Sequence, residues 1–223
     1  MYPVFLNLTG RLCVVVGGGG VAERKVKGLL QEGAFVRVIS PEVTVELAAL
    51  AAEGKIDWRK KKYGSTDLDK AFLVFAATNH RQIQDVICRQ SLENRQLINV
   101  ADDPACCNFQ VPATFRRGDL TLAISTGGKS PAVAAFIREK MEDEFGPEYA
   151  VLLDIMSDIR QKTTLMGMDG LSQADRKKIY KKILHNDIIN WIKTGRLDEL
   201  QNHLRNILGP EADPEIKKLK LDH

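Results

Sequence analysis

The sequence predicts an α/β fold with a parallel sheet in its N-terminal half, then a short strand and helix, and finally a helical C-terminal part. Two observations predict it. Short runs rich in β-branched residues alternate with longer helical patterns over the first hundred residues, which is typical of crossover connections between parallel strands. From about residue 148 onward the pattern is almost entirely helical. We therefore expect three parts, at 1–113, 114–147 and 148–223.

The first strand–helix–strand unit has the clearest pattern. Strands are predicted at 12–16 and 35–39, which consist almost entirely of apolar residues. Between them, apolar residues recur with helical spacing over 21–32, and Gly33 stands where such a helix would end. The same reasoning predicts four further elements: a helix at 43–53, a strand at 73–77, a helix at 83–94 and a strand at 97–100.

The elements after residue 113 are of a different kind. A strand of alternating polarity is predicted over 119–125. Ser130 is a suitable N-cap, and Pro131 a suitable first residue, for a helix that ends near residue 144. Four more helices are predicted, at 148–163, 172–186, 187–194 and 196–208.

The composition excludes several classes of function. The formal charge is only +3, from 32 basic and 29 acidic residues, and no segment concentrates the excess, so we expect no nucleic-acid partner. The apolar runs are shorter than the ~18 residues of a membrane span, and the N-terminus lacks a secretion signal, so we expect no membrane association. The four cysteines have neither disulfide-framework nor metal-site spacing. We predict a cytoplasmic protein with no metal ligands, in which Cys106 and Cys107 are packing residues.

A glycine-rich motif lies between the first strand and the first helix. Gly17, Gly19 and Ala22 form the pattern G-x-G-x-x-A, in the context where it binds a dinucleotide pyrophosphate at a helix N-terminus. We assign the tight turn to Gly17, close approach of the backbone to the phosphates to Gly19, and close packing of helix on strand to Ala22. The motif predicts a Rossmann-type domain. The alternative is a simple turn between a strand and a helix.

The end of the second strand bears on the choice of cofactor. A Rossmann domain is expected to place an acidic residue there, which binds the ribose hydroxyls. Glu42 comes about two positions late, so it either binds the ribose or opens the next helix. No arginine stands at that strand end, which favours NAD over NADP without deciding between them.

Two further strands end in polar residues, and a second glycine loop follows. Thr78 and Asn79 lie at the sheet edge where α/β proteins bind ligands, and they either contact a cofactor or form a turn and helix cap. Asp102 is either a general base or part of an Asp-Asp-Pro turn. The loop 126–131 suits a phosphate or carboxylate but lacks the first Walker A glycine, and it is also explained as a capped turn.

Taken in this order, the motifs resemble the precorrin-2 dehydrogenase/sirohydrochlorin ferrochelatase family, the N-terminal module of siroheme synthases. The resemblance extends to about residue 150 and rests on five segments, 2–6, 16–25, 77–79, 99–102 and 125–131. It implies NAD-dependent oxidation of precorrin-2 to sirohydrochlorin in siroheme biosynthesis. In some members, insertion of ferrous iron follows, so Fe²⁺ or Co²⁺ would be a transient partner. The resemblance also implies a homodimer whose contact includes the segment 114–147.

The resemblance implies roles for individual residues. Asp102 matches an aspartate implicated in both reactions, in which it takes up protons. Four positions match residues that contact NAD: Gly20, Val21, Pro41 and Glu42. Four more match a loop that binds the tetrapyrrole and its carboxylates: Gly127, Gly128, Lys129 and Ser130.

Two departures from the family pattern leave other functions open. His80 stands where many relatives have an acidic residue, and Asp103 adds a carboxylate beside Asp102. The alternatives are a dehydrogenase for another small molecule and a nucleotide-sensing Rossmann regulatory protein without catalysis. The sensor would need neither Asp102 nor the 126–131 loop. The sequence does not decide whether the chain inserts a metal.

Overall fold

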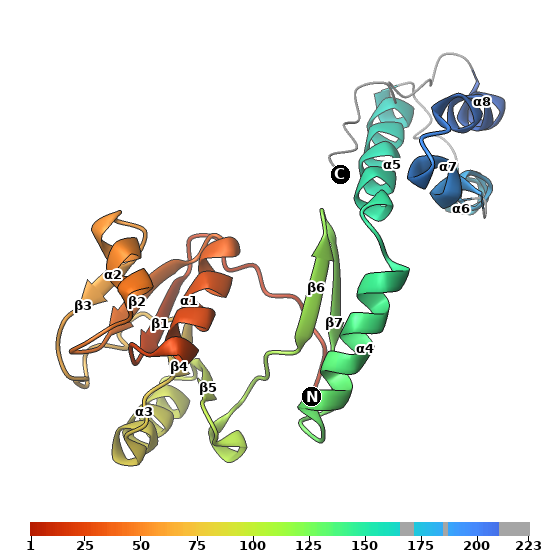
Figure 1. The fold of residues 1–223 in the computed structure, drawn as a ribbon. Helices are drawn as coiled ribbons and strands as arrows, with labels where there is room; N and C mark the ends of the chain where they lie inside the picture. Colours follow the sequence, from red (N-terminus) through yellow and green to blue (C-terminus); the bar gives the residue numbers. More distant parts are fainter. Residues whose placement is uncertain (166–171, 185–186, 210–223) are drawn as a thin grey trace. The chain divides into compact units, whose positions relative to one another are not determined.

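The computed structural model describes residues 1–165, 172–184 and 187–209, and it divides the chain into two compact units, Met1–Val111 and Pro112–His223 (Figure 1). The first unit contains the parallel sheet, and the second contains a hairpin and the remaining helices. The division falls close to the boundary expected at residue 113. Parts of the segment 148–223 lie outside the described residues.

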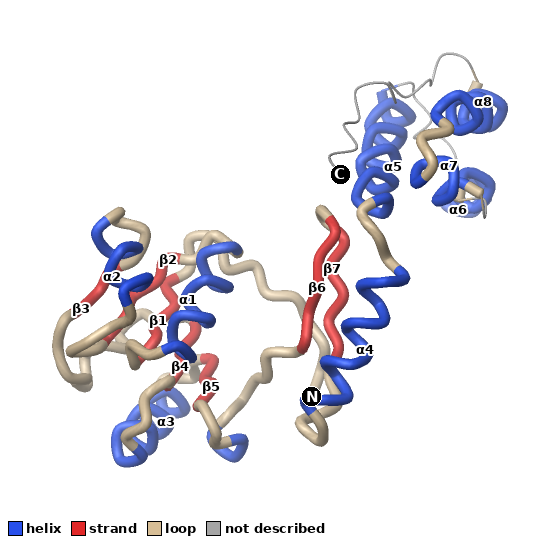
Figure 2. The backbone as a smooth tube through the Cα atoms, in the orientation of Figure 1, coloured by secondary structure: helices blue, strands red, loops and turns tan. Residues whose placement is uncertain are grey.

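Five parallel strands form the sheet of the first unit, in the order β3-β2-β1-β4-β5. They are β1 (Leu12–Val16), β2 (Phe35–Ile39), β3 (Asp57–Arg59), β4 (Leu73–Ala76) and β5 (Leu97–Val100). Three helices connect them, α1 (Gly20–Gln31), α2 (Val45–Ala52) and α3 (Arg81–Glu93) (Figure 2). The chain adds strands on one side of β1 and then on the other. The predicted Rossmann-type fold is thereby confirmed, with its switch point between β1 and β4.

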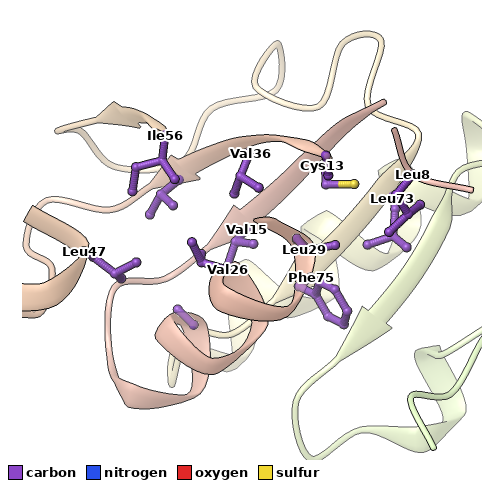
Figure 3. Close-up of a cluster of buried hydrophobic side chains, with 13 residues drawn as sticks. Leu8, Cys13, Val15, Val26, Leu29, Val36, Leu47, Ile56, Leu73 and Phe75 are labelled. Atoms are coloured by element: carbon purple, nitrogen blue, oxygen red, sulfur yellow. The ribbon is translucent and has the colours of Figure 1, made fainter. Parts of the chain in front are cut away.

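Two apolar cores lie on the two faces of this sheet. On one face, Val26 of α1 and Leu47 of α2 belong to the same core as Val15 of β1 (Figure 3). On the other face, Ile87 of α3 belongs to the same core as Val14 of β1. Successive β1 residues thus enter opposite cores. A strand buried on both faces has no polar side, which explains its continuous apolar run.

The edge strand β3 is absent from the sequence-based prediction. It has three residues in a polar stretch, so no apolar pattern marks it. Polar side-chain contacts add to its backbone pairing with β2. The indole of Trp58 donates to the carbonyl oxygen of Ser40 at 3.0 Å. The Asp57 carboxylate lies 2.8 Å from both Arg37 and Arg59.

In the second unit, a hairpin stands where a single strand is expected. Strands β6 (Ala113–Arg117) and β7 (Leu120–Ile124) pair antiparallel, with Arg117 opposite Leu120. Gly118, in the two-residue turn, has a φ of 54°, which glycine adopts without the steric cost of a Cβ. The expected strand–helix segment is therefore a hairpin followed by a helix. The strand expected at 119–125 is present as β7, whereas its partner β6 was not predicted.

Helix α4 (Pro131–Glu144) follows the hairpin and contacts both of its strands. Ser130 is its N-cap as predicted, since its hydroxyl accepts a hydrogen bond from the Val133 amide at 3.2 Å. Further helices share an apolar core that includes Ile155 and Leu204. They are α5 (Glu148–Leu165), α6 (Gln173–Ile183), α7 (Ile188–Lys193) and α8 (Leu197–Leu208).

Candidate functional site

Neighbouring strands of the sheet end in register at one edge. Val16 is opposite both Ile39 and Ala76, and Ala76 is also opposite Val100. The segments that follow these four residues therefore leave the sheet at the same edge. They include the glycine loop and the turn that carries Asp102. This is the carboxyl edge, where open α/β sheets bind their ligands.

Two glycines of the loop are required by close backbone packing. Gly17 has a φ of 126°, and a Cβ added to it would overlap the carbonyl group of Ala77. A Cβ added to Gly18 would overlap the carbonyl oxygen of Glu42. Gly18 is not singled out by the G-x-G pattern, in which it is the variable position. Its requirement comes from the segment after β2, and the only sequence signal for it is the uninterrupted run of glycines.

The next two glycines face open space. No other atom lies within 4 Å of a Cβ added to Gly19 or Gly20. Gly19 is the N-cap of α1, so no side chain caps the first amide groups of this helix. Exposed amides at a helix N-terminus bind phosphate groups, and the missing side chains leave room for them. Ala22 points the other way and is buried in the core, as expected for a residue that packs α1 on the sheet.

A cleft of 740 Å³ lies over this loop. Its walls come from the glycine loop, the segment after β2 and the segment after β4. Of the nine predicted cofactor-binding residues, all except Ala22 line it: Gly17, Gly19, Gly20, Val21, Pro41, Glu42, Thr78 and Asn79. Gly19 and Gly20 form an open glycine cradle in the lining of this cleft, which fits a dinucleotide. Direct contact of each residue with the cofactor remains a prediction.

The structure removes one alternative for Glu42. Helix α2 begins at Val45, and its N-cap is Thr44, whose hydroxyl accepts a hydrogen bond from Leu47. Glu42 therefore does not open the helix, and its exposed side chain lies in the cleft lining. The hydroxyl of Ser40 donates to the Glu42 carbonyl oxygen at 2.6 Å and fixes the backbone at that point.

The residues after β4 form a turn and line the cleft, and their contact with a cofactor stays a prediction. The Thr78 hydroxyl accepts a hydrogen bond from the His80 amide at 3.3 Å, which makes a turn. Asn79 is not a helix cap, because the N-cap of α3 is His80. Both Thr78 and Asn79 also line the cleft.

A second cleft of 470 Å³ shares part of this lining and extends toward β3. Its further lining includes Lys62, Tyr63 and Arg81, none of which sequence reasoning singled out. Burial, with the nearby carboxylates of Asp67 and Asp69, raises the pKa of Tyr63 to about 12. The hydroxyl of Tyr63 is therefore uncharged at physiological pH, where it lines the cleft. It was missed because it follows β3, which has no sequence signal.

Asp102 lies in a tight turn after β5. Its φ of 61° is in the left-handed region, which aspartate adopts more readily than most residues. The side chain is exposed and lines neither cleft. Ala76 and Val100, the last residues of β4 and β5, are opposite each other. Thr78 and Asp102 each follow one of these residues by two positions. The register thus supports the expectation that Asp102 lies near the cofactor site.

The loop 126–131 belongs to the second unit. The Thr126 hydroxyl donates to the Ser130 carbonyl oxygen at 3.0 Å and accepts from the Ser130 amide at 3.1 Å. Gly127 and Gly128 have φ values of 63° and 82°, and the side chain of Lys129 is exposed. The loop is therefore a capped turn, which was one of its two interpretations. Substrate binding there remains a prediction.

Comparison with known proteins bears directly on this site. Residues 4–113 match the NAD(P)-binding family model NAD_binding_7, and residues 117–144 match the model "Sirohaem biosynthesis protein central". A precorrin-2 dehydrogenase of Priestia megaterium is 39% identical over 160 residues, which cover 72% of this chain and 79% of the relative. The chain belongs to the precorrin-2 dehydrogenase family.

Other relatives extend this family assignment along the chain. The solved structure of SirC, a precorrin-2 dehydrogenase, superimposes with a TM-score of 0.74 at 32% identity, covering 93% of this chain and 98% of that one. A siroheme synthase of Nitrosococcus oceani is 33% identical over 215 residues, but this chain covers only 45% of it. The chain spans less than half of that longer relative.

The cysteines differ from expectation. Cys106 packs against the core under α3, as expected, but it also forms a disulfide with Cys88, which their spacing did not reveal. The Cys107 sulfur is hydrogen-bonded to backbone atoms of Val100 and Asp103. Within the described ranges, no group of three or more His, Cys, Asp or Glu side chains is arranged to hold a metal. Nor does any helix in those ranges have the length and apolarity to cross a membrane.

Proposed function

We propose that the chain oxidises precorrin-2 to sirohydrochlorin, with NAD as the hydride acceptor, as a step in siroheme biosynthesis. One observation carries the proposal for a chain of this family. The open glycine loop follows β1 and the Asp102 turn follows β5, and these two strands flank β4 and end at the same edge of the sheet. A dinucleotide and a proton acceptor are what a dehydrogenase of this kind must bring together.

The chain's own groups bind and orient the cofactor. Amide groups at the start of α1, beside Gly19 and Gly20, would hold the pyrophosphate, and the carboxylate of Glu42 would hold a ribose. Thr78 and Asn79 form the facing wall of the cleft. When bound, NAD supplies a nicotinamide ring that accepts a hydride.

Asp102 takes up the proton. Oxidation of the substrate removes two hydrogens, and the one that leaves as a proton needs an acceptor on the chain. The ionised carboxylate of Asp102 accepts the proton and later releases it to water. The loop 126–131 contributes amide donors and the charge of Lys129, which suit the carboxylates of a tetrapyrrole.

The second unit supplies the dimer contact of the proposed homodimer. Val133 and Phe136 are three residues apart on α4, and their exposed fractions are 47% and 56%. Residues at this spacing lie on the same face of a helix. Large apolar side chains exposed together in this way favour a partner surface.

The test is turnover of the purified chain. Incubation with precorrin-2 and NAD is expected to give the absorption spectrum of sirohydrochlorin and one NADH per product. Asp102→Asn, which tolerates the left-handed backbone, is expected to retain NAD binding and lose about a hundredfold or more in turnover. Failure to form sirohydrochlorin, beside an authentic enzyme that forms it, rejects the proposed function. Unchanged turnover in Asp102→Asn rejects the role of Asp102.

Metal insertion into sirohydrochlorin is a second candidate activity. It is favoured by the match to the Nitrosococcus oceani siroheme synthase over 96% of this chain. The measurement is anaerobic consumption of sirohydrochlorin with Fe²⁺ or Co²⁺, compared with the spontaneous rate. No acceleration over that rate would leave a dehydrogenase alone.

A further inference from the structure

We propose that Arg81 and Asp103 form a positioning pair, which holds the Asp102 turn at a fixed distance from the cofactor cleft. The inference rests on the proposed function, in which Asp102 accepts the substrate proton. Asp103 is the carboxylate that departs from the family pattern. It is therefore assigned to positioning and not to proton transfer.

The ion pair joins the cleft to the turn. Arg81 is the first residue of α3 and lines the 470 Å³ cleft. Its guanidinium lies 2.8 Å from the Asp103 carboxylate, whose side chain is only 14% exposed. A carboxylate that is largely removed from water needs a charged or hydrogen-bonding partner. Arg81 supplies that partner and so fixes the residue that follows Asp102.

Gln84 makes a second connection on the other side of Asp102. Its buried side-chain amide donates to the carbonyl oxygen of Thr78 at 2.6 Å and to that of Ala101 at 3.4 Å. One amide group thus bridges a residue that lines the cleft and the residue that precedes Asp102. Movement of the turn would break this bridge.

The disulfide makes a third connection from the same helix. Cys88 of α3 is bonded to Cys106, which lies in the short 3₁₀ helix Pro104–Cys106 after the turn. Arg81, Gln84 and Cys88 are spaced i, i+3 and i+7, so they lie on one face of α3. That face therefore holds the chain both before and after Asp102.

Asp102 depends on these neighbours for its orientation. In the part of the chain that the structure describes, no hydrogen bond or ion pair of its carboxylate is found. Its side chain is exposed and its backbone is left-handed. The direction of the carboxylate is thus set by the backbone, and the backbone is held by Ala101, Asp103 and Cys106. A shift of about 1 Å in a reacting group can cost about a hundredfold in rate.

The main test compares two neutralised carboxylates that share the same arginine. Asp103→Asn removes the charge of the less exposed partner of Arg81, since the Asp103 side chain is 14% exposed. The control, Asp85→Asn, removes its exposed partner, which lies 3.2 Å from the guanidinium. We expect Asp103→Asn to lower kcat for precorrin-2 oxidation about tenfold or more. The Kd and KM for NAD should stay within about twofold. Asp85→Asn should leave all three constants within about twofold of wild type.

A second set of variants tests whether Arg81 acts through this pair. At saturating NAD, Arg81→Lys keeps the positive charge and should retain most of kcat, whereas Arg81→Met should lose about as much as Asp103→Asn. The double variant Arg81→Met/Asp103→Asn should cost no more than either single change, because both break one interaction. If Asp103→Asn does not fold in a melting experiment, the contrast between Arg81→Lys and Arg81→Met still decides the question.

Three results overturn the positioning role: an unchanged kcat in Asp103→Asn, an equal loss in Asp85→Asn, or additive losses in the double variant. Asp102→Asn separates this failure from failure of the proposed function. If that variant is inactive while the Arg81 and Asp103 variants are fully active, only the positioning role fails. If Asp102→Asn is also fully active, the assignment of Asp102 in the proposed function fails as well.

Discussion

The backbone of Gly17 packs directly against the carbonyl group of Ala77, which follows the neighbouring strand. The amide of Gly17 also donates to the Ile39 carbonyl oxygen at 3.0 Å. The first turn of the glycine loop therefore touches the ends of both strands that flank β1. The loop is as much a part of the sheet edge as of the cofactor site.

The glycines of this loop should separate stability from binding. Gly17→Ala forces a Cβ into the Ala77 carbonyl group, so it should lower the free energy of unfolding by about 3 kcal/mol. Gly20→Ala meets open space and favours the helix by up to about 1 kcal/mol, but it blocks the cradle and should weaken NAD binding. Denaturant unfolding and NAD titration measure the two effects. Unweakened NAD binding in Gly20→Ala would contradict the assignment of the cradle.

Glu42 should decide between NAD and NADP. A carboxylate at the cleft binds ribose hydroxyls and repels the additional phosphate of NADP. Glu42→Ala should therefore weaken NAD binding by about tenfold and change NADP binding much less. Glu46→Ala is the control, because Glu46 lies on α2 outside the cleft lining. If the ratio of the NAD and NADP dissociation constants is unchanged in Glu42→Ala, the ribose binds elsewhere.

Phe136 should be needed for the dimer. Removing a charge from water at an apolar contact costs free energy on association. Phe136→Glu should therefore yield monomers in light-scattering measurements at micromolar concentration. Val45→Glu is the matched control. Val45 is 88% exposed on α2, in the other unit. A wild-type chain that is already monomeric at that concentration contradicts the proposed homodimer.

Cys13 should contribute to the loss of stability in alkaline solution. Burial raises the pKa of its thiol from 9.0 to about 11. The native state therefore keeps a proton that the unfolded state releases, and the associated stability is complete below pH 9 and lost as the pH rises toward 11. A shift of this size corresponds to about 3 kcal/mol. The unfolding free energy of Cys13→Ala should fall less steeply over this range than that of the wild type. If the unfolding free energies of the wild type and Cys13→Ala fall equally steeply with pH, the proposed role of Cys13 is contradicted.

The disulfide should stabilise the first unit. Cys88 and Cys106 are separated by 18 residues, and cross-linking a loop of this length restricts the unfolded chain by about 3 kcal/mol. Reductant should lower the free energy of unfolding of the wild type by about that amount and leave Cys88→Ser unaffected. Peptide mapping without reductant should recover the 88–106 bond. Free thiols at both positions in the purified, unreduced chain would contradict the pairing.

The sequence pattern predicted those elements and caps whose formation depends on residues close together in the chain. The fully buried β1, the amphipathic α1 and the Ser130 cap each have a local signature. Strands β3 and β6 have none, because β3 is polar and at an edge and β6 carries two arginines at its end. Eight of the nine residues proposed from the sequence to bind the cofactor line one cleft in the structure.

Contacts between distant segments were beyond the reach of the pattern. The need for glycine at position 18 comes from the Glu42 carbonyl oxygen, which lies over the loop only because β1 and β2 are in register. The pairing of Arg81 with Asp103 likewise requires that α3 packs beside the end of β5. Neither residue type nor spacing along the chain predicts such a contact. These relationships exist only after the sheet has formed.

Among the described residues, the helices from α5 to α8 share an apolar core that includes Leu152 of α5 and Leu208 of α8. A change of side-chain volume there is therefore felt first by neighbours in the same group of helices. This core is distinct from the two cores on the sheet that support the glycine loop and the Asp102 turn.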